Sequence, residues 1–413
     1  METQLITKTL EKLKHNFSKG IYFYCTSPTI PEKTHYLHNL ICLAEGCREL
    51  GIPIYSNVTS WQISCENSDC LFLHDPNIRP SDCSVVILDQ GWIDVEQNPL
   101  PSDLFQSGRE YVTVYIDGSD GAATRSWHPA FESFDLVLRT HMLEEFQYPK
   151  NFYPWVFGIS NRMMAYLDQV PDSVARNQHL LISFRNTKNQ HSVRQWMYRS
   201  FLDQLNLALA FSELEGNFNP NQSSDASTDV VNTKNDNLYW RQTGRRHNPH
   251  YYAALKTSLA SACFGGFFVQ PFGRNHATKF SILSKRLLSK WGIPSSTIIQ
   301  WDSWRLWESL LAGCVSFHAD FDQYHFALPV KPENWKHYVG VDCRNPKATV
   351  ERILDEPEIL HMIAENGRKW AISHYAPVPT TLRFLELIRQ VKSSSIRHNF
   401  RNNIMPLAST DNE

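Results

Sequence analysis

Neither sign of charge dominates this chain of 413 residues. Its 40 lysine and arginine residues are balanced by 42 aspartate and glutamate residues, which leaves a formal net charge of −2. Proteins that bind nucleic acid usually carry a basic excess. The charge balance therefore argues against a nucleic-acid partner.

Long hydrophobic segments are also missing. The sequence has no run of 18 apolar residues, and its first 20 residues are polar and amphipathic, without the apolar core of a signal peptide. We therefore expect no transmembrane segment. The nine cysteines are an odd number and are scattered, which is typical of reduced thiols in a cytosol. We expect a cytoplasmic protein.

Metal-binding patterns are absent as well. The tightest group of potential ligands is Cys65, Cys70, His74 and Cys83, and its spacing matches no common zinc pattern. We expect no metal. What remains is a globular composition, with 42% hydrophobic and 20% charged residues, in a chain long enough for two domains of ordinary size.

The first half of the chain alternates short buried-looking strands with helical spacing. Apolar residues recur at helical intervals over 35–50. Predicted strands occupy 21–24, 52–55, 83–89, 111–117 and 134–140. Such a succession predicts a parallel sheet with helices on both faces, so residues 1–160 should form a Rossmann-like domain.

The second half restarts this pattern. We expect a strand at 179–185, helices at 192–206 and 303–312, a helix leading into a strand at 251–266, a short strand at 298–300 and a strand at 314–317. These elements predict a second Rossmann-like domain over 175–345, and ligands should bind beyond the carboxyl ends of its strands. The polar stretch 213–237 predicts a mobile insertion.

The C-terminal part is helical by the same criterion. Helices at 350–375 and 380–391 make up a segment, 346–392, that we expect to pack back across the domains. Residues 393–413 predict a flexible tail.

The stretch "WDSWRLWESLLAGCVSFHAD" (301–320) places charged residues at the start of a helix. Asp302 or Ser303 can cap that helix. Arg305 opposes the helix dipole at this end, which makes sense if an anion such as a diphosphate docks there. Glu308, one turn later, could accept hydrogen bonds from sugar or ribose hydroxyls. The alternative is a solvated Arg–Glu pair that contributes about 0.3 kcal/mol.

The segment "SWRLWESLLAGCVSF" (303–317) resembles the donor-site signature of exostosin-like glycosyltransferases. The segments 180–197, 251–274 and 321–342 resemble further pieces of that family in the same order, so the resemblance covers roughly 180–345. Ser316 stands where the family usually has a proline. The N-terminal half shows no specific match.

This resemblance implies a GT-B glycosyltransferase, with two Rossmann-like domains facing a cleft. It implies a nucleotide-sugar donor on the second domain, an acceptor hydroxyl on the first, inversion at the sugar carbon and no metal or cofactor beyond the donor. The acceptor can be a glycan, a lipid, a protein or a small molecule. The implied donor-binding residues are Arg185, Ser303, Arg305, Glu308 and Gly273.

Three residues of the first half are candidates for the general base. Asp117 and Asp120 lie in "YIDGSDG" (115–121), at the end of a predicted strand, where a carboxylate could deprotonate the acceptor. His35 follows the first strand and has a suitable pKa range. The alternatives are an Asp-Gly turn and a solvated or capping histidine.

Two other functions use the same kind of fold. A non-catalytic carbohydrate- or nucleotide-binding protein would keep the donor pocket and lack a working base. A dinucleotide-dependent oxidoreductase would need a Gly-X-Gly-X-X-Gly turn after its first strand, and "CTSPTIPEKTH" contains no glycine.

Overall fold

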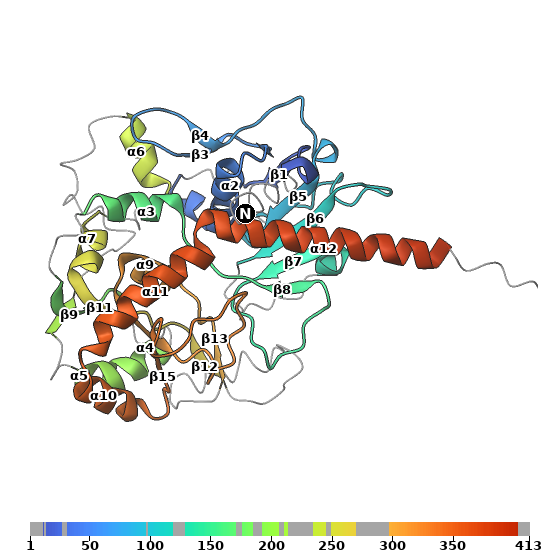
Figure 1. Ribbon diagram of the computed structural model, residues 1–413. Coiled ribbons are helices and arrows are strands. Elements are labelled where there is room, and N and C mark those ends of the chain that lie inside the picture. Colours follow the sequence, from blue (N-terminus) through green and yellow to red (C-terminus); the bar gives the residue numbers. More distant parts are fainter. Residues whose placement is uncertain are drawn as a thin grey trace, which may run out of the picture.

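The computed structural model describes residue 11 and the ranges 14–26, 31–95, 98–118, 129–170, 176–184, 192–205, 210–213, 234–244, 249–269 and 297–403. Within these ranges the chain forms two parallel sheets (Figure 1).

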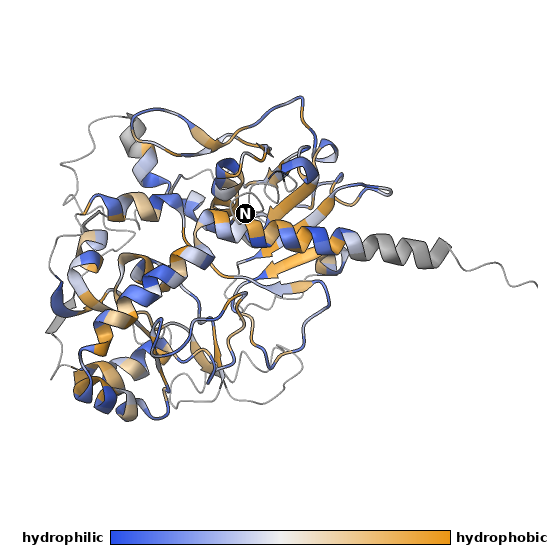
Figure 2. Ribbon diagram, in the orientation of Figure 1, coloured by the Kyte–Doolittle hydropathy of each residue, from blue (hydrophilic) through white to orange (hydrophobic). Residues whose placement is uncertain are grey.

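The first sheet has the strand order β2-β1-β5-β6-β7-β8, and all of its neighbouring strands are parallel. The strands are β1 (Ile21–Tyr24), β2 (Ile54–Ser56), β5 (Val85–Asp89), β6 (Val112–Asp117), β7 (Leu136–Arg139) and β8 (Phe152–Pro154). The central strands are buried along their whole length and appear as hydrophobic arrows in Figure 2. Burial on both faces is what a parallel sheet covered by helices requires.

Three features of the first domain differ from the predicted elements, and one of them is the additional edge strand β8. The expected helix over 35–50 is split into a 3-10 helix, η1 (Pro31–Leu37), and α2 (His38–Glu49). An antiparallel hairpin of β3 (Ser60–Gln62) and β4 (Cys70–Phe72) follows β2. Each hairpin strand has only three residues, too few to produce a visible period of two in the sequence.

The second sheet has the order β10-β9-β11-β14-β15 and is also parallel. Its strands are β9 (Asn177–Ile182), β10 (Ala210–Glu213), β11 (Ser258–Ala262), β14 (Val315–Ala319) and β15 (Val339–Val341). A separate antiparallel pair joins β12 (Phe267–Val269) and β13 (Thr297–Ile299). The prediction of two Rossmann-like parallel α/β domains is confirmed.

Helices connect and cover the second sheet. They include α4 (Ser192–Met197), η5 (Tyr198–Leu202), α5 (Asp203–Leu205), α6 (Lys234–Arg241), α7 (Pro249–Thr257), α9 (Trp304–Ala312) and α10 (Pro346–Asp355). Strand β10 ends at Glu213 and α6 begins at Lys234, so ordered elements reach into both ends of the insertion predicted at 213–237. Its central part lies outside the described residues.

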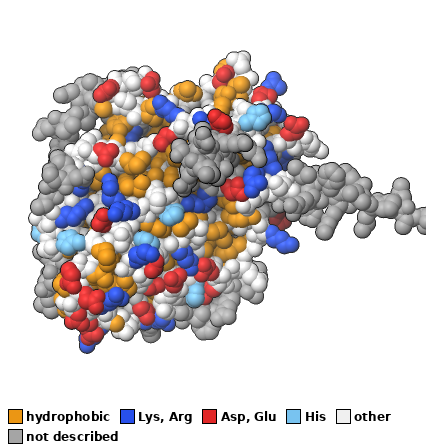
Figure 3. Space-filling model, in the orientation of Figure 1, with side chains coloured by type: hydrophobic (Ala, Val, Ile, Leu, Met, Phe, Trp, Pro, Cys, Tyr) orange, Lys and Arg blue, Asp and Glu red, His pale blue; other side chains and the backbone are white. Residues whose placement is uncertain are grey.

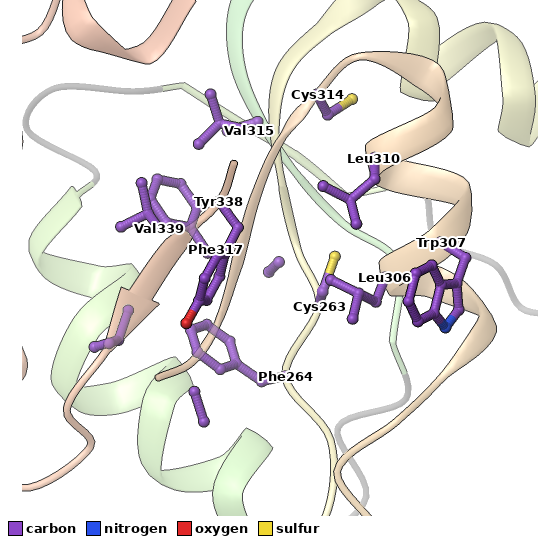
Figure 4. Close-up of a cluster of buried hydrophobic side chains, with 14 of the residues drawn as sticks. Cys263, Phe264, Leu306, Trp307, Leu310, Cys314, Val315, Phe317, Tyr338 and Val339 are labelled. Carbon is purple, nitrogen blue, oxygen red and sulfur yellow. The ribbon is translucent and has the colours of Figure 1, made fainter. Parts of the chain in front are cut away.

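The face of α9 that lies against the sheet carries large apolar side chains. Leu306 and Leu310 approach the strands, and Trp307 is fully buried beside them (Figure 4). Trp304 is only half-buried, although its spacing from Trp307 and Leu311, three and seven residues, would place it on their buried face. Gly313 ends the helix with a φ of 72°, the left-handed conformation that glycine adopts without strain.

Two C-terminal helices complete the molecule, α11 (Ile359–Tyr375) and α12 (Pro377–Asn403). The predicted helix over 350–375 is therefore interrupted between Asp355 and Ile359. Helix α12 runs across to the first domain, where Phe384, Leu385 and Ile388 join the hydrophobic core beside α2 (Figure 1). It continues to Asn403, past residue 393, where we expected the chain to fray.

Three observations concern the molecule as a whole. None of the helices in the described ranges combines the length and apolarity needed to cross a membrane. All nine cysteines fall within the described ranges and are free thiols. Acidic and basic side chains are mixed on the face shown in Figure 3.

Candidate functional site

The strand order of each sheet contains one switch point. In the first sheet, the strands that follow β1 in the sequence are placed on both sides of it, with β2 on one side and β5 on the other. In the second sheet, β10 and β11 lie on opposite sides of β9 in the same way. In open parallel sheets the ligand crevice opens beyond the carboxyl ends of the strands at such a switch point.

Two arginines meet at the switch point of the second sheet. Arg305 donates from Nε to Ser183 Oγ (3.1 Å) and from Nη2 to the Ser183 carbonyl (3.2 Å), just after β9. Arg194 donates from Nε to the carbonyl of Phe264, just after β11 (2.8 Å). The guanidinium carbon of Arg194 lies 5.4 Å from the Phe184 ring centroid, and that of Arg305 lies 5.8 Å from it. The carboxyl ends of β9 and β11 therefore carry two positive charges.

These two charges repel each other in a half-buried position. Burial, and then the nearby charge of Arg305, lower the pKa of Arg194 to about 9. Among the described residues, the hydrogen bonds of both guanidiniums go to neutral oxygens. An anion between them would relieve the repulsion, and planar guanidinium forks match phosphate oxygens well.

The start of α9 adds a further polar group. Ser303 is the N-cap residue, with an extended backbone, but its side chain caps no N–H group. Its Oγ atom is buried and has no hydrogen-bond partner among the described residues. Buried polar atoms are usually paired, so an unpaired one at the N-terminus of the helix that carries Arg305 fits an anion-binding position.

Asp302 is not the N-cap residue of α9, and its side chain forms other hydrogen bonds. Its carboxylate accepts hydrogen bonds from the Trp307 indole (2.9 Å) and from the backbone N–H of Phe157 (2.9 Å), in the segment that leaves the first domain. Its own N–H donates to His141 Nδ1 (3.0 Å), just after β7. Burial raises the pKa of Asp302 to about 7, and the N–H donors act against that rise. Asp302 therefore joins the two domains.

Glu308 does not form the solvated pair with Arg305 that the spacing allows. It is buried, and each carboxylate oxygen accepts a phenol: Tyr251 donates to Oε2 (3.1 Å) and Tyr252 to Oε1 (3.0 Å). Burial, followed by the Glu308 charge, raises the pKa of both tyrosines. These two phenol donors hold the Glu308 carboxylate in place.

At the switch point of the first sheet, the structure places a carboxylate that the sequence analysis did not single out. Asp89 ends β5, is buried, and accepts from the backbone N–H of Gly91 (3.1 Å). Burial raises its pKa to about 7. Its place as the final, polar residue of an otherwise apolar strand is the signal that could have identified it.

The predicted base candidates fall in different places. Asp117 ends β6, but it is buried and forms an ion pair with Arg139 of β7 (3.1 Å). The Asp117 carboxylate is therefore buried between the ends of β6 and β7 and is not exposed at the edge of a cleft, as a general base would be. Asp120 lies outside the described residues.

His35 lies between the two domains. It sits in η1, after β1, and its ring centroid is 5.4 Å from that of Trp304, the first residue of α9. The fold thus brings His35 close to the helix that carries Arg305 and Glu308. Arg185 and Gly273 lie outside the described residues. In the described part of the chain, no cluster of three His, Cys, Asp or Glu side chains could hold a metal ion.

No protein-family model matches the sequence, and no curated protein matches it either. Among solved structures, the chain is similar to the pneumococcal O-GlcNAc transferase GtfA in complex with UDP and GlcNAc (TM-score 0.37, 11% identity, 74% of this chain and 56% of that chain). It is also similar to Anabaena Alr3699/HepE in complex with UDP-glucose (TM-score 0.38, 12% identity, 91% of this chain and 99% of that chain).

A third similar structure is an α-glucosyltransferase in complex with UDP and DNA (TM-score 0.42, 8% identity, 89% of this chain and 98% of that chain). The chain thus spans little more than half the length of GtfA and nearly all of the other two. At these identities and scores, the likenesses assign no activity to this chain.

Proposed function

We propose that this chain is a glycosyltransferase that moves a sugar from a nucleotide-sugar donor to an acceptor hydroxyl. The observation that carries the proposal is the pair of arginines at the switch point of the second sheet, one of which, Arg305, lies in the first turn of the helix that Ser303 begins. Two cations and a helix N-terminus form a site for a diphosphate. The resemblance of 303–317 to a donor-site signature supports the same assignment.

In this proposal, the acceptor oxygen attacks the anomeric carbon of the sugar while the bond from that carbon to the diphosphate breaks. The electron pair of the broken bond leaves with the nucleoside diphosphate. Arg194, Arg305 and Ser303 stabilise the negative charge that develops there. Because these side chains supply the positive charge, the reaction would need no metal. Glu308 would hold hydroxyls of the donor.

We assign the general base to His35 in preference to Asp117. His35 lies beside the donor helix, whereas the Asp117 carboxylate is buried against Arg139. The proton of the acceptor hydroxyl would pass to the His35 imidazole. A base on the opposite domain from the diphosphate suits attack from the far face of the sugar, which would invert the anomeric centre. Asp120 remains the second candidate.

The proposal predicts selective binding of one nucleoside diphosphate. The test is a thermal-shift panel with UDP, GDP, CMP, ADP, dTDP, their nucleotide sugars and NAD(P), on wild type and on Arg305→Ala. A ligand at about a hundred times its Kd stabilises the folded state by about 2.7 kcal/mol, which raises Tm by several degrees. We expect one diphosphate to give this shift and Arg305→Ala to weaken it.

Arg389→Ala is the matched control, because Arg389 pairs with Glu386 on the exposed surface of α12. It should bind like the wild type. If no nucleotide shifts the wild type, or if only NAD(P) does, the transferase proposal is wrong. If a nucleotide sugar binds but is never consumed with any acceptor, the chain is a binding protein on the same fold.

A further inference from the structure

The hairpin of β3 and β4 reaches from the first domain to the second. The backbone of Gln62 forms two hydrogen bonds with the side chain of Gln242, just after α6: its N–H donates to Oε1 (2.9 Å), and its carbonyl accepts from Nε2 (2.6 Å). Both residues are buried. The neighbouring Trp61 has a φ of 63°, a conformation that a bulky side chain adopts only when its surroundings hold it there.

Arg162 lies at the centre of this junction. It belongs to α3 (Asn161–Asp168), is only 4% exposed, and donates to the carbonyls of Tyr239 (2.6 Å) and Gln62 (2.5 Å). Its guanidinium carbon is 3.6 Å from the Tyr239 ring centroid and 4.5 Å from that of Trp61. One planar cation thus joins α3, the hairpin and α6. A lysine could not bond both carbonyls and stack between two rings.

One turn further along α3, Tyr166 contacts the donor site. Its ring stacks on that of Tyr252, with centroids 5.5 Å apart and an interplanar angle of 13°. Tyr252 in turn donates to Glu308. Lys256, also on α7, donates to the carbonyls of Leu167 and Val170 at the end of α3. Helices α3 and α7 are therefore fixed to each other.

The amino end of α3 is held by the first domain. The backbone N–H of Asn161 donates to Glu45 Oε2 (2.7 Å), and its side chain donates to Glu49 Oε1 (2.6 Å). Both glutamates belong to α2. Helix α3 is thus attached to the first domain through its first two residues, Asn161 and Arg162, and to α7 through its second half.

We propose that Arg162 is a positioning residue that couples the first-domain hairpin to Glu308, through Tyr166 and Tyr252. This inference rests on the proposed function, because it gives Glu308 its role toward the donor hydroxyls. The proposed diphosphate contacts, Arg194 and Arg305, bond to Phe264 and Ser183, neither of which links Arg162 to Glu308. Ser183 contacts Tyr251, the second tyrosine on Glu308. Loss of Arg162 should therefore weaken recognition of the sugar and spare recognition of the diphosphate.

The test compares Arg162→Lys and Arg162→Ala with wild type by calorimetric binding of UDP, GDP, ADP and dTDP and of UDP-glucose, GDP-mannose, ADP-glucose and dTDP-glucose. Hydrogen exchange of α7 is measured on the same samples. We expect the affinity for the nucleotide sugar to fall about tenfold, with little change for its diphosphate, and α7 to exchange faster. Arg162→Lys keeps the charge and serves if the alanine variant does not fold.

Thr381→Val is the control for general destabilisation. Thr381 on α12 donates to the Leu43 carbonyl of α2, a bond that involves none of the residues linking Arg162 to Glu308, so its loss should change neither α7 exchange nor the ratio of the two affinities. Unchanged α7 exchange in both Arg162 variants would overturn the coupling, and so would an equal loss of sugar and diphosphate affinity. If the wild type binds none of the eight nucleotides, the proposed function fails, and the exchange data still decide the coupling.

Discussion

Arg305 and Glu308 lie one helical turn apart and have opposite environments. Arg305 is half-buried at the end of β9 and bonds only to Ser183 among the described residues. Glu308 is buried and held by two tyrosines. A buried carboxylate is costly unless hydrogen bonds satisfy it, and the two tyrosine hydroxyls supply such bonds to Glu308.

At the same scale, His35 and Asp117 should respond differently to removal of their proton-accepting groups. His35→Asn should lower kcat about 10²- to 10⁴-fold, because a general base contributes about that much, and should leave diphosphate affinity unchanged. Asp117→Asn should instead cost about 3–5 kcal/mol of stability, because it leaves Arg139 buried without its charge partner. Turnover assays and urea unfolding measure the two effects.

The assignment of the base would be wrong if His35→Asn turned over donor at the wild-type rate. A kinetic defect in Asp117→Asn at unchanged stability would point to the carboxylate instead. Either result separates the two residues, since each variant is expected to change only one of the two measurements.

Among the secondary-structure elements, α3 has the most consequential contacts. Only eight residues long, it touches α2, the hairpin, α6 and α7. The N–H of Asn161, its first residue, donates to the Glu45 carboxyl group of α2, which is buried. Burial raises the pKa of Glu45 to about 8, and the Asn161 N–H and the Arg162 charge partly oppose that rise.

This raised pKa predicts a stability that falls as pH rises. Glutamate has an ordinary pKa of 4.5, so between about pH 4.5 and 8 the folded protein keeps a proton on Glu45 that the unfolded chain releases. The contribution is full below about pH 4.5 and is lost as pH rises through about 8. The slope is at most about 1.4 kcal/mol per pH unit.

Glu45→Gln should remove this slope. The amide oxygen still accepts a hydrogen bond from the Asn161 N–H, but the side chain at position 45 no longer titrates. Urea unfolding of both proteins between pH 5 and 8 measures the difference. The buried Asp89 and Asp302 have raised pKa values in both proteins, so the slopes are compared and not the absolute values. Equal slopes would mean that Glu45 is ionised in the folded state.

For the whole molecule, α12 is the element that returns the end of the chain to its beginning. It crosses α2 so closely at Gly46 that a Cβ atom there would overlap the carbonyl oxygen of Pro377 and the Thr381 hydroxyl. Thr381 Oγ1 donates to the Leu43 carbonyl at the same crossing (3.1 Å). The close approach of two backbones explains the glycine inside a helix, where it otherwise lowers stability.

Gly46→Ala should therefore destabilise the protein, although alanine favours helix. Overpacking typically costs about 1–3 kcal/mol, and here the obstacle is backbone that cannot rotate away. Gly108→Asn is the control, because Gly108 has open space around it and a φ of 74° that asparagine tolerates. Thermal unfolding should show a drop of several degrees only for Gly46→Ala. An unchanged Tm would mean that α12 can shift without loss.

The sequence by itself determined the fold class and the helix that bears the candidate site. Apolar strands such as 85–89 and 112–117 can only be buried on both faces, so their hydrophobic runs are visible without tertiary information. Helix α9 has a strong amphipathic spacing and a glycine stop, and it begins and ends where these signals predict. Local chemistry decides such features.

Only the tertiary structure decided which of the candidate residues come together. Arg194 and Arg305 are far apart in the chain and meet because β9 and β11 are neighbours. Contacts between distant segments likewise decide that Asp117 is paired with Arg139 and that Arg162 joins α3 to the hairpin. Periodicity records which side of an element faces the core, and it carries no information about the partner that the other side meets.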